Sequence, residues 1–525
     1  MAVFFVSDPK LPVLPAMGLV EHVVSDTLHL SSSTTIVLLL FVLSTALVSA
    51  YTRSSKNTSY PPGPRGYPYI GSINIPFKKP WFTYIEWGNK YNSELIHYTR
   101  FGRHYLIINT LEAATDLLEK NSRFTSDRCL SSLDIISGWR KIVALLPYSE
   151  EWRLQRKVYH QNFRAEASVR FHPAEIHCVR EFAKGLIKKS ELTLMDQIAT
   201  LSQKIMFKAL YGLEISTNKD SIPESAREVI DAMEDFMMPG RDGLKSSPFH
   251  RLFPSLKKSV PVVQQQIDQT VEGPWDLMMD ALKSDPSSNR DFESSLIPNL
   301  ISKLDADADS NALNRIKLMG GTAIAAAADT TMSSISTFFL AMSFYPDVQA
   351  KAQKELDTVL GPGKLPTFED RSSLPYIEAV YREVMRWHPA IPLGLPHGTS
   401  ADIFYKGYYI PKGTIIFSNI WAMTHNPSTF TNPDAFIPER HIQKDGKFES
   451  INSIWAYGFG RRVCIGRHMA NDTIWLAIAT VLATTKITKL PNENVEDYFS
   501  DASFCTPKLP DYMTLPRFED MSFST

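Results

Sequence analysis

YGFGRRVCIG, residues 457–466, places one cysteine among three glycines and two arginines. The glycines permit backbone conformations in which a chain can approach a flat group closely. An apolar helix is expected to begin just after Cys464, and its N-terminal amides would favour the thiolate over the thiol. Arg462 is a permanent cation that can hold a carboxylate. A glycine loop leading into a core helix is the simpler explanation, but the coincidence of these residues predicts that Cys464 binds the metal of a flat, carboxylate-bearing cofactor.

The other cysteines, Cys129, Cys178 and Cys505, lie far from Cys464 and from one another. No Cys-x-x-Cys pair and no Cys/His cluster occurs in the sequence, which argues against a zinc site and against a disulfide framework. The spacing fits a reducing compartment, where an isolated cysteine is usually a small buried hydrophobe. These three cysteines are therefore predicted to be inert.

The composition is that of a globular protein with a sizeable core: 525 residues, of which 44% are apolar and 21% charged. This length allows one large domain or two domains. The net charge of -1 gives no reason to expect a nucleic acid as a partner.

An uncharged apolar segment near the N-terminus, Thr34–Tyr51, reads TTIVLLLFVLSTALVSAY. As a helix with a rise of about 1.5 Å per residue it would span roughly 27 Å, close to the hydrocarbon thickness of an endoplasmic-reticulum bilayer. A cleaved signal peptide is the alternative. It is disfavoured because Asp8, Glu21 and Asp26 precede the segment, whereas a signal peptide begins with a short basic region.

Basic residues follow this segment, among them Arg53, Lys56 and Arg65, while only Lys10 precedes it. The positive-inside rule therefore places the body of the chain in the cytosol, on an endoplasmic-reticulum membrane that the chain crosses once. The expected organisation is a lumenal segment 1–30, a transmembrane anchor 31–52, a basic and proline-rich hinge 53–70, and a folded domain 71–525.

Helical periodicity dominates the rest of the chain, and strand-like pieces are short. The expected helices are Leu111–Lys120, Glu150–Asn162, Pro173–Lys189, Leu192–Tyr211, Asn311–Phe344, Asp347–Leu360, Tyr376–Trp387 and Cys464–Ala483. The expected strands are Leu95–Arg100, Tyr105–Asn109, Asp402–Tyr405, Tyr408–Ile410 and Thr414–Ser418. The fold is therefore predicted to be mainly α, with a small β-sheet assembled from distant segments.

Two of the expected helices carry polar groups with more than one explanation. Glu383 and Arg386 share one helical face, a pattern that is most often a solvated surface pair. Asp329 and Thr330 follow four alanines in the middle of the longest helix. Small residues let a helix lie against a flat group, but an alanine-rich core helix whose threonine bonds back to a carbonyl is an equal alternative.

Together these motifs resemble the cytochrome P450 family of haem-thiolate monooxygenases, whose cysteine loop reads Phe-x-x-Gly-x-Arg-x-Cys-x-Gly. The resemblance implies that Cys464 is the axial ligand of the iron of haem b. The chain departs from the pattern at Tyr457, where an aromatic ring is nevertheless kept. The loop residues that the resemblance places against the cofactor are Phe459, Gly460, Arg462 and Gly466.

Further matches follow in the order that the family has them, from about Pro61 to the C-terminus. The resemblance implies that Trp152 and Arg156, in a Trp-x-x-x-Arg pattern, contact the haem propionates together with His397. It also implies a buried structural network that fixes the cysteine loop. The members of that network are Glu383 and Arg386, with Arg440 of a matching Phe-x-Pro-Glu-Arg segment.

The family pattern Ala/Gly-Gly-x-Asp/Glu-Thr aligns with the centre of the long helix. The resemblance makes Asp329 and Thr330 the acid and alcohol that deliver protons to bound oxygen. Ala327 stands where the family usually has glycine, which puts the local distortion of the helix in doubt but not the proton pair.

The resemblance implies a large helical domain with a small β-sheet subdomain, and a monooxygenase that inserts one atom of O2 into a lipophilic molecule such as a terpenoid, steroid or polycyclic aromatic. No Gly-x-Gly-x-x-Gly follows a strand, so electrons are expected from a separate NADPH-dependent reductase in the membrane. A basic face including Arg461, Arg467 and Lys157 is the expected dock. The exact amino-acid sequence of several motifs is similar to that of basidiomycete family members that act in secondary metabolism.

Alternatives remain open. A haem-thiolate isomerase or dehydratase would need no reductase, and the Asp329–Thr330 pair counts against it. A haem-binding sensor or a non-haem helical membrane protein would leave that pair or the cysteine loop unexplained. Arg128 and Arg140 could bind a substrate carboxylate or a propionate, or face water.

Overall fold

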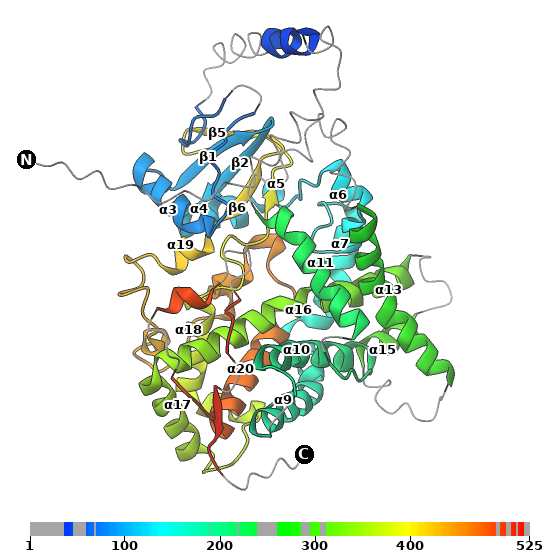
Figure 1. Cartoon of the computed structure of the whole chain (residues 1–525), viewed down its shortest axis with the longest axis vertical. Helices are drawn as coiled ribbons and strands as arrows, with labels where there is room; N and C mark the ends of the chain where they lie inside the picture. Colours follow the sequence, from blue (N-terminus) through cyan, green and yellow to red (C-terminus); the bar gives the residue numbers. More distant parts are fainter. Residues whose placement is uncertain are drawn as a thin grey trace, which may run out of the picture.

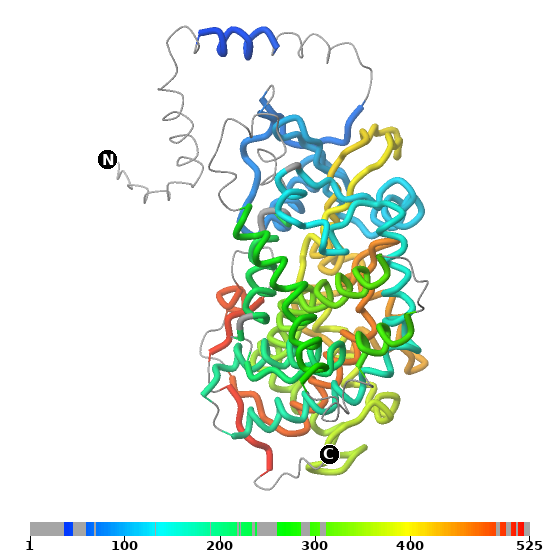
Figure 2. Tube along the Cα trace, turned by 90° about the vertical axis from the view of Figure 1, so that its right-hand side faces the viewer, coloured from blue at the N-terminus to red at the C-terminus, as the bar shows by residue number. Residues whose placement is uncertain are grey.

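A computed structural model describes residues 36–45, 59–67, 70–188, 191–217, 220–238, 260–284, 295–304, 311–489, 494–499, 506–510 and 513–518. A mainly helical body carries its largest sheet at one end (Figure 1). Viewed from the side, the N-terminal strands lie at one end of the molecule and the C-terminal strand at the other (Figure 2). The predicted fold class, a helical body with a small sheet from distant segments, is confirmed.

The α-helices of the described chain vary from short turns to one helix that crosses the whole body. They are α3 (Pro80–Tyr91), α4 (Leu111–Ala114), α5 (Ser122–Thr125), α6 (Ser132–Ile136), α7 (Glu150–Phe163), α8 (Ala165–Ser168), α9 (His172–Ile187), α10 (Leu194–Tyr211), α11 (Ser221–Met237), α13 (Val260–Ser284), α15 (Leu296–Ser302), α16 (Ala312–Phe344), α17 (Pro346–Val359), α18 (Pro375–Trp387), α19 (Ile420–Thr424) and α20 (Arg467–Thr484).

Shorter helical turns connect them. One is a π-helix, η1 (Thr115–Lys120), which continues α4. The others are 3-10 turns: η2 (Trp139–Lys141), η3 (Val169–Phe171), η6 (Phe368–Ser373), η7 (Pro438–His441), η8 (Ile451–Ser453), η9 (Trp455–Tyr457), η10 (Gly460–Arg462) and η11 (Val495–Tyr498).

The described strands form one four-stranded sheet and two antiparallel pairs. They are β1 (Leu95–Arg100), β2 (Arg103–Ile108), β3 (His397–Gly398), β4 (Ile403–Tyr405), β5 (Tyr408–Ile410), β6 (Ile415–Ser418), β7 (Thr485–Ile487) and β8 (Thr514–Pro516). The large sheet has the order β1-β2-β6-β3, while β4 pairs with β5 and β7 with β8.

Local chemistry explains the hairpin at the sheet edge. β1 and β2 pair antiparallel from Leu95↔Ile108 to Arg100↔Arg103. The two residues between them, Phe101 and Gly102, both have positive φ, 48° and 79°, the conformation of a tight two-residue hairpin turn. The second pairing of β2 is long-range, because β6 joins it in parallel with Tyr105 opposite Ile415.

The long helix α16 passes through the centre of the body (Figure 1). Its sequence is rich in alanine and small residues, and it ends where Pro346 begins α17, because proline cannot continue the ladder of amide donors. Helix α10 runs antiparallel to α16 and packs closely against the small side chains of α16. Gly320 is one reason, since a Cβ there would lie 2.0 Å from the Tyr211 hydroxyl.

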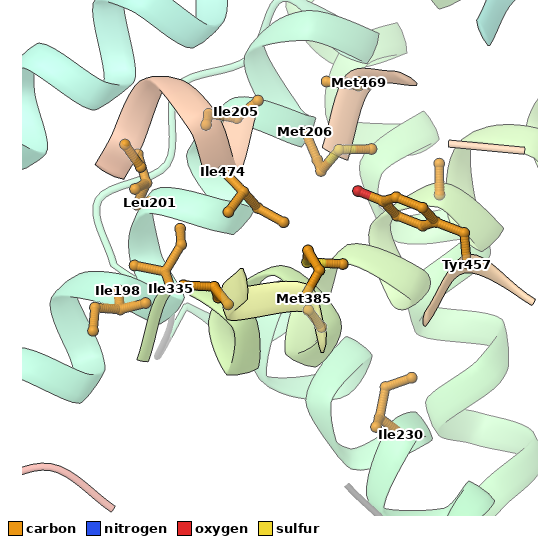
Figure 3. Packing of buried hydrophobic residues seen from close by; sticks show 14 of the residues in the cluster. Ile198, Leu201, Ile205, Met206, Ile230, Ile335, Met385, Tyr457, Met469 and Ile474 are labelled. Carbon is orange, nitrogen blue, oxygen red and sulfur yellow. The ribbon is translucent and has the colours of Figure 1, made fainter. Parts of the chain in front are cut away.

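The helical core is one cluster of buried apolar side chains. Figure 3 shows a region of it, where side chains of α10, α16, α18 and α20 lie together with the ring of Tyr457 from the cysteine loop. A second, smaller cluster fills the space beneath the sheet, and it includes Leu106, Leu118, Ile416 and Phe459. The cysteine loop therefore contributes to both clusters and joins the helical core to the sheet.

The N-terminal region of the chain is described in two pieces. Residues 36–45 form a helix whose apolar side chains are exposed, for example Val37 and Leu39 at 64%. Among the described residues no helix is both long and apolar enough to cross a membrane. The remainder of the predicted anchor 31–52, and the lumenal segment 1–30, lie outside the described residues.

The second piece begins at Ser59 and lies along the sheet. The Ser59 carbonyl accepts from the Tyr409 amide at 2.8 Å, and the Pro62 carbonyl accepts from the His97 amide at 2.9 Å. The ring of Tyr60 stacks on that of His97 with 4.9 Å between their centres. The part of the predicted hinge 53–70 that begins at Ser59 therefore packs against the sheet.

The sequence contains two Asn-x-Ser/Thr glycosylation patterns, Asn57-Thr58-Ser59 and Asn471-Asp472-Thr473, and the second lies inside α20. Asn471 accepts a hydrogen bond from Arg371 at 3.0 Å, and Thr473 is buried with its hydroxyl donating to Glu175 at 2.7 Å. The Asn471 Nδ2, the atom that would carry a glycan, donates to Asp472 at 2.9 Å, so both polar atoms of this amide are engaged in packing. The other pattern begins at Asn57, outside the described residues.

Candidate active site

The loop that carries Cys464 folds back on itself. The Cys464 amide donates to the Tyr457 carbonyl at 2.8 Å, and Gly458 and Gly460 between them have φ values of 79° and 58°. Helix α20 begins only at Arg467, later than the sequence predicted. In the turn before the helix, the Gly466 amide is directed at the Cys464 sulfur.

The glycines of this loop have different reasons to be glycine. A Cβ on Gly460 would lie 2.0 Å from the carbonyl oxygen of Leu118, so this glycine lets the loop pack against η1. Phe459 beside it is buried, and both residues thus anchor the loop on its sheet side. A Cβ on Gly458 or Gly466 would meet nothing within 4 Å, and these two positions border open space.

The Cys464 side chain is accessible, yet protein surrounds it so fully that burial dominates its acidity. An accessible sulfur deep in the protein lines an internal space. Burial raises the pKa of the Cys464 thiol, whereas Arg156, the Gly466 amide and Arg467 lower that pKa. The groups that oppose the effect of burial are those that a thiolate needs.

Arg462 is nearly buried and has one unused donor. Its Nε donates to the Ser126 carbonyl and its Nη2 to the Leu146 carbonyl, both at 2.8 Å. Its Nη1 is buried without a hydrogen-bond partner. Because an unpaired buried donor is costly, Nη1 indicates an acceptor that belongs at this place. Burial and the charge of Arg128 lower the pKa of Arg462.

Helix α7 presents Trp152 and Arg156 one turn apart. The helix starts at Glu150 because the Ser149 hydroxyl accepts from the Trp152 amide. Trp152 is buried, and Arg156 donates from Nη2 to the Val463 carbonyl at 2.6 Å, next to Cys464. The pair thus borders the cysteine loop from the side of α7.

His397 lies in β3 and is buried. Its Nδ1 donates to the Thr125 carbonyl at 3.0 Å, because a carbonyl can only accept. Burial, followed by the charge of Arg128, lowers the pKa of His397 to about 3. The ring is therefore neutral at pH 7 and its Nε2 carries a lone pair.

For Arg128 the sequence allows three alternatives, and the structure places this residue beside Arg462. It is buried, with Nε donating to the Ala144 carbonyl at 2.9 Å and Nη1 to the carbonyls of Leu395 and Pro396. Its charge lowers the pKa of both Arg462 and His397. Arg140, in contrast, is exposed on η2.

The three guanidinium groups of Arg128, Arg156 and Arg462 form a cationic cluster beside an open thiol. Each is buried or half-buried, and the charges of the three repel one another. Asp127 is the carboxylate that offsets Arg128 and Arg462. Haem fits this arrangement, since its two propionates would supply the missing anions and its iron binds a thiolate.

The middle of α16 carries a strip of accessible surface in a helix that is otherwise buried there. Ala326 is exposed and Thr330 half-buried, while Ala325, Ala328 and Asp329 are buried. The Thr330 hydroxyl donates to the Ala326 carbonyl at 2.7 Å. Thr330 is thus bonded back to its own helix and also borders open space, so both explanations of the sequence pattern apply.

Asp329 is buried beside charged residues of α11. Burial and then the charge of Asp231 raise the pKa of Asp329 to about 6, while Arg227 acts in the opposite direction. Asp231 and Arg227 are themselves exposed. Nothing in the sequence pointed to α11 as a neighbour of Asp329, because the two helices are about a hundred positions apart.

Glu383, Arg386 and Arg440 form one buried ion-pair network. Arg386 donates to both carboxylate oxygens of Glu383, at 2.7 Å and 2.8 Å, and the Arg440 Nε lies 3.2 Å from the same carboxylate. His441 is a further partner, at 2.8 Å, which the sequence did not indicate. Hydrogen bonds from Arg386 and His441 lower the pKa of Glu383 against the effect of its burial.

The two arginines of this network use their remaining donors on the chain that leads to the cysteine loop. Arg386 donates to the carbonyls of Thr424 and Pro433, at 3.0 Å and 2.8 Å, and Arg440 to the Thr431 carbonyl at 2.8 Å. The network therefore holds the segment between α19 and η7.

The family model described as Cytochrome P450 matches residues 61–515. The chain is a cytochrome P450. Cytochrome P450 monooxygenase ple1 of Rhodocybe pseudopiperita is 35% identical over 454 residues, which cover 84% of this chain and 86% of that protein. Cytochrome P450 monooxygenase COX1 of Coprinopsis cinerea is 34% identical, covering 82% and 85%. Cytochrome P450 monooxygenase claR of Ampulloclitocybe clavipes is 33% identical, covering 88% and 87%.

This cytochrome P450 therefore belongs to a family of haem-thiolate oxidoreductases that use O2, a redox partner and lipophilic substrates. The family resemblance of the motifs is confirmed by the length of the match and by the basidiomycete relatives.

Proposed function

We propose that this cytochrome P450 binds haem b through the thiolate of Cys464 and inserts one oxygen atom from O2 into a lipophilic small molecule. The observation that carries the proposal is the buried, unpaired Nη1 of Arg462 in a cationic cluster beside an accessible thiol. Haem, when bound, supplies an iron that accepts single electrons and activates dioxygen.

The chain would hold the cofactor from three sides. The cations of Arg128, Arg156 and Arg462 would neutralise the two propionates, and Trp152 and His397 would complete this rim. On the proximal side the Gly466 amide donates to the sulfur, and Arg467 favours the thiolate further. Phe459 and Gly460 keep the loop in place against the sheet and η1.

Asp329 and Thr330 would deliver protons on the other side. A carboxyl group with a pKa of about 6 both gains and loses a proton near neutral pH, as a general acid requires. The Thr330 hydroxyl lies on the accessible strip of α16 and can pass a proton on once it turns away from the Ala326 carbonyl.

The network of Glu383, Arg386 and Arg440 has a structural role in this proposal. It fixes the segment before the cysteine loop, and Tyr457 packs the start of that loop into the helical core. None of the three network residues has to touch the reacting atoms.

Electrons would come from a separate NADPH-dependent reductase that docks on a basic face. Arg461 and Lys157 are exposed there, with Arg467 half-buried between loop and helix. Reversing the charge of Arg461 and Lys157 is expected to slow reduction at low salt while the Kd of a bound inhibitor stays the same. Reversal of Lys447, which is exposed elsewhere and pairs with Asp445, is the control.

The exposed apolar side chains of residues 36–43 support a single-pass anchor over 31–52, preceded by the lumenal segment 1–30 and followed by the hinge before Ser59. The location would be the endoplasmic reticulum, with the catalytic domain 71–525 in the cytosol. The proposal includes a lipophilic substrate, such as a terpenoid, steroid or polycyclic aromatic. It also includes a place in fungal secondary metabolism or xenobiotic oxidation.

The spectrum of the reduced protein under carbon monoxide tests the proposal. The full chain should show the red-shifted Soret band of thiolate ligation, and Cys464→Ala should lose this band. Cys129→Ala changes a half-buried cysteine in a different loop and should keep it. If Cys464→Ala kept the band, another ligand would have to be sought. Oxidation that needs both reductase and NADPH then distinguishes a monooxygenase from an isomerase or dehydratase.

A further inference from the structure

We infer that Ser202 of α10 is a positioning residue for the Asp329–Thr330 pair. The inference rests on the proposed function of that pair. Ser202 is 2% exposed, and its hydroxyl donates to the carbonyl oxygen of Ala327 at 2.6 Å. The acceptor is the backbone of the residue that stands where the family usually has glycine.

The bond belongs to a fixed interface between two antiparallel helices. At one point of this interface Ser202 meets Ala327, and at another Tyr211 lies against Gly320, where no side chain would fit. Because two contacts far apart along α10 fix the register, the Ser202 hydroxyl is held opposite the Ala327 carbonyl.

Successive carbonyls of α16 are bound from different sides. The Ala326 carbonyl accepts from Thr330 of its own helix at 2.7 Å, whereas the Ala327 carbonyl accepts from the neighbouring helix. The Thr330 carbonyl in turn accepts from Ser334 at 3.1 Å. In a regular helix each carbonyl accepts one amide, and an added donor tilts the carbonyl off the axis and bends the helix.

The chemistry of residue 327 explains why an outside donor is useful. Glycine is a weak helix former and loosens the segment in which it stands, whereas alanine is the strongest helix former. With Ala327 the segment before Asp329 would be more regular. The hydroxyl of Ser202 binds the carbonyl of this alanine and would draw it towards α10, which would loosen the segment at Thr330 within a helix that is continuous over Ala312–Phe344.

The consequence can be measured without knowing the substrate. With NADPH as the electron source, dioxygen is reduced either by two electrons and two protons to hydrogen peroxide, or by four electrons and four protons to two waters. Poor proton delivery favours the peroxide branch. Ser202→Ala is expected to lower the ratio of water to peroxide about fivefold, the effect of one lost hydrogen bond.

Matched variants separate positioning from packing. Ala327→Gly combined with Ser202→Ala should recover most of the ratio, and Ser202→Thr, which keeps the hydroxyl, should stay close to the native protein. Ser336→Ala is the control, since it removes another hydroxyl between α16 and α10, which contacts Met195 Sδ at 3.7 Å. An unchanged ratio in Ser202→Ala, or no recovery in the double variant, overturns the inference.

Backbone hydrogen exchange provides a second measurement that involves no turnover. If Ser202 opens the helix, Ser202→Ala makes α16 more regular and the Thr331 amide exchanges more slowly. If Ser202 only packs the helices together, the same amide exchanges faster, which contradicts the inference. Native protein that consumes no dioxygen with reductase would refute the proposed function, while the exchange result would still decide whether Ser202 opens the helix.

Discussion

The guanidinium carbon of Arg462 lies 4.4 Å from the centre of the Trp152 ring, and the same guanidinium has a buried Nη1 without an acceptor. The contact with Trp152 orients the N–H donors of the Arg462 guanidinium. The unpartnered Nη1 remains available to an anion. A planar guanidinium can stack and donate at the same time, whereas an ammonium group cannot reproduce this geometry.

Arg462→Lys is therefore expected to weaken haem retention while the positive charge is kept. Loss of two backbone contacts and of the Nη1 donor should speed haem dissociation by about tenfold or more. The measurement is transfer of haem to an excess of apomyoglobin. Arg461→Lys is the matched control, because Arg461 is exposed. Equal dissociation rates for the two variants would contradict the assignment of Arg462.

Because of Asp329, the folded protein should become less stable as the pH rises. Its pKa is raised by burial from 3.8 to about 6, so its neutral form is favoured in the folded state. The stability that this adds is present below the unfolded pKa and is lost as pH rises through about 6. At pH 7.5 the buried charge should cost on the order of 3 kcal/mol.

Asp329→Asn should accordingly raise the melting temperature at pH 7.5 and leave it nearly unchanged at pH 3.5. Asp231→Asn, which removes the nearby charge but keeps the carboxyl group of Asp329, should lower the pKa of Asp329 and retain some of the pH dependence. A melting temperature of Asp329→Asn that differs from the native value equally at both pH values would count against a raised pKa.

Gly460→Ala tests whether the loop glycine serves the fold. The added Cβ would meet the Leu118 carbonyl, and alanine is strained at a φ of 58°. A loss of about 1–3 kcal/mol in the free energy of unfolding is expected. Gly466→Ala has open space around the new methyl and a φ of -76°, so its stability should stay within about 0.5 kcal/mol of native. Chemical denaturation of the cofactor-free protein measures both.

Glu383→Gln removes the anion of a buried network. Arg386, Arg440 and His441 would then face one another without a carboxylate, and a loss of about 3–5 kcal/mol is expected. Soluble yield and the urea midpoint are the measurements. Glu449→Gln, at an exposed position, should change neither of them. Native stability of Glu383→Gln would show that the network is dispensable.

Much of the fold could be predicted because local pattern decides it. The helices α7, α10, α16 and α18 were placed to within a few residues by apolar periodicity, caps and proline. The strands β1 and β2 lie close to the two stretches that the sequence predicts, Leu95–Arg100 and Tyr105–Asn109. Family motifs then added the order of the site residues and the fold class.

What could not be predicted depends on contacts between distant positions. Parallel pairing of β2 with β6 joins segments some three hundred positions apart, and no periodicity records it. Arg128 remained ambiguous because only the folded chain shows that its charge acts on Arg462 and His397. Ser202 carries no motif at all, and its meaning appears only with its acceptor on α16.

The hydrogen bond from His397 to the Thr125 carbonyl has a consequence for how the protein is loaded. With Nδ1 engaged and the pKa near 3, a carboxylate can bind at Nε2 only if a proton binds with it. Binding through this histidine is then a coupled uptake of anion and proton, and its apparent affinity falls about tenfold for each unit by which the pH rises. This uptake is opposite in sign to the proton that the Cys464 thiol gives up when it binds iron as a thiolate, so the two proton exchanges offset each other during loading.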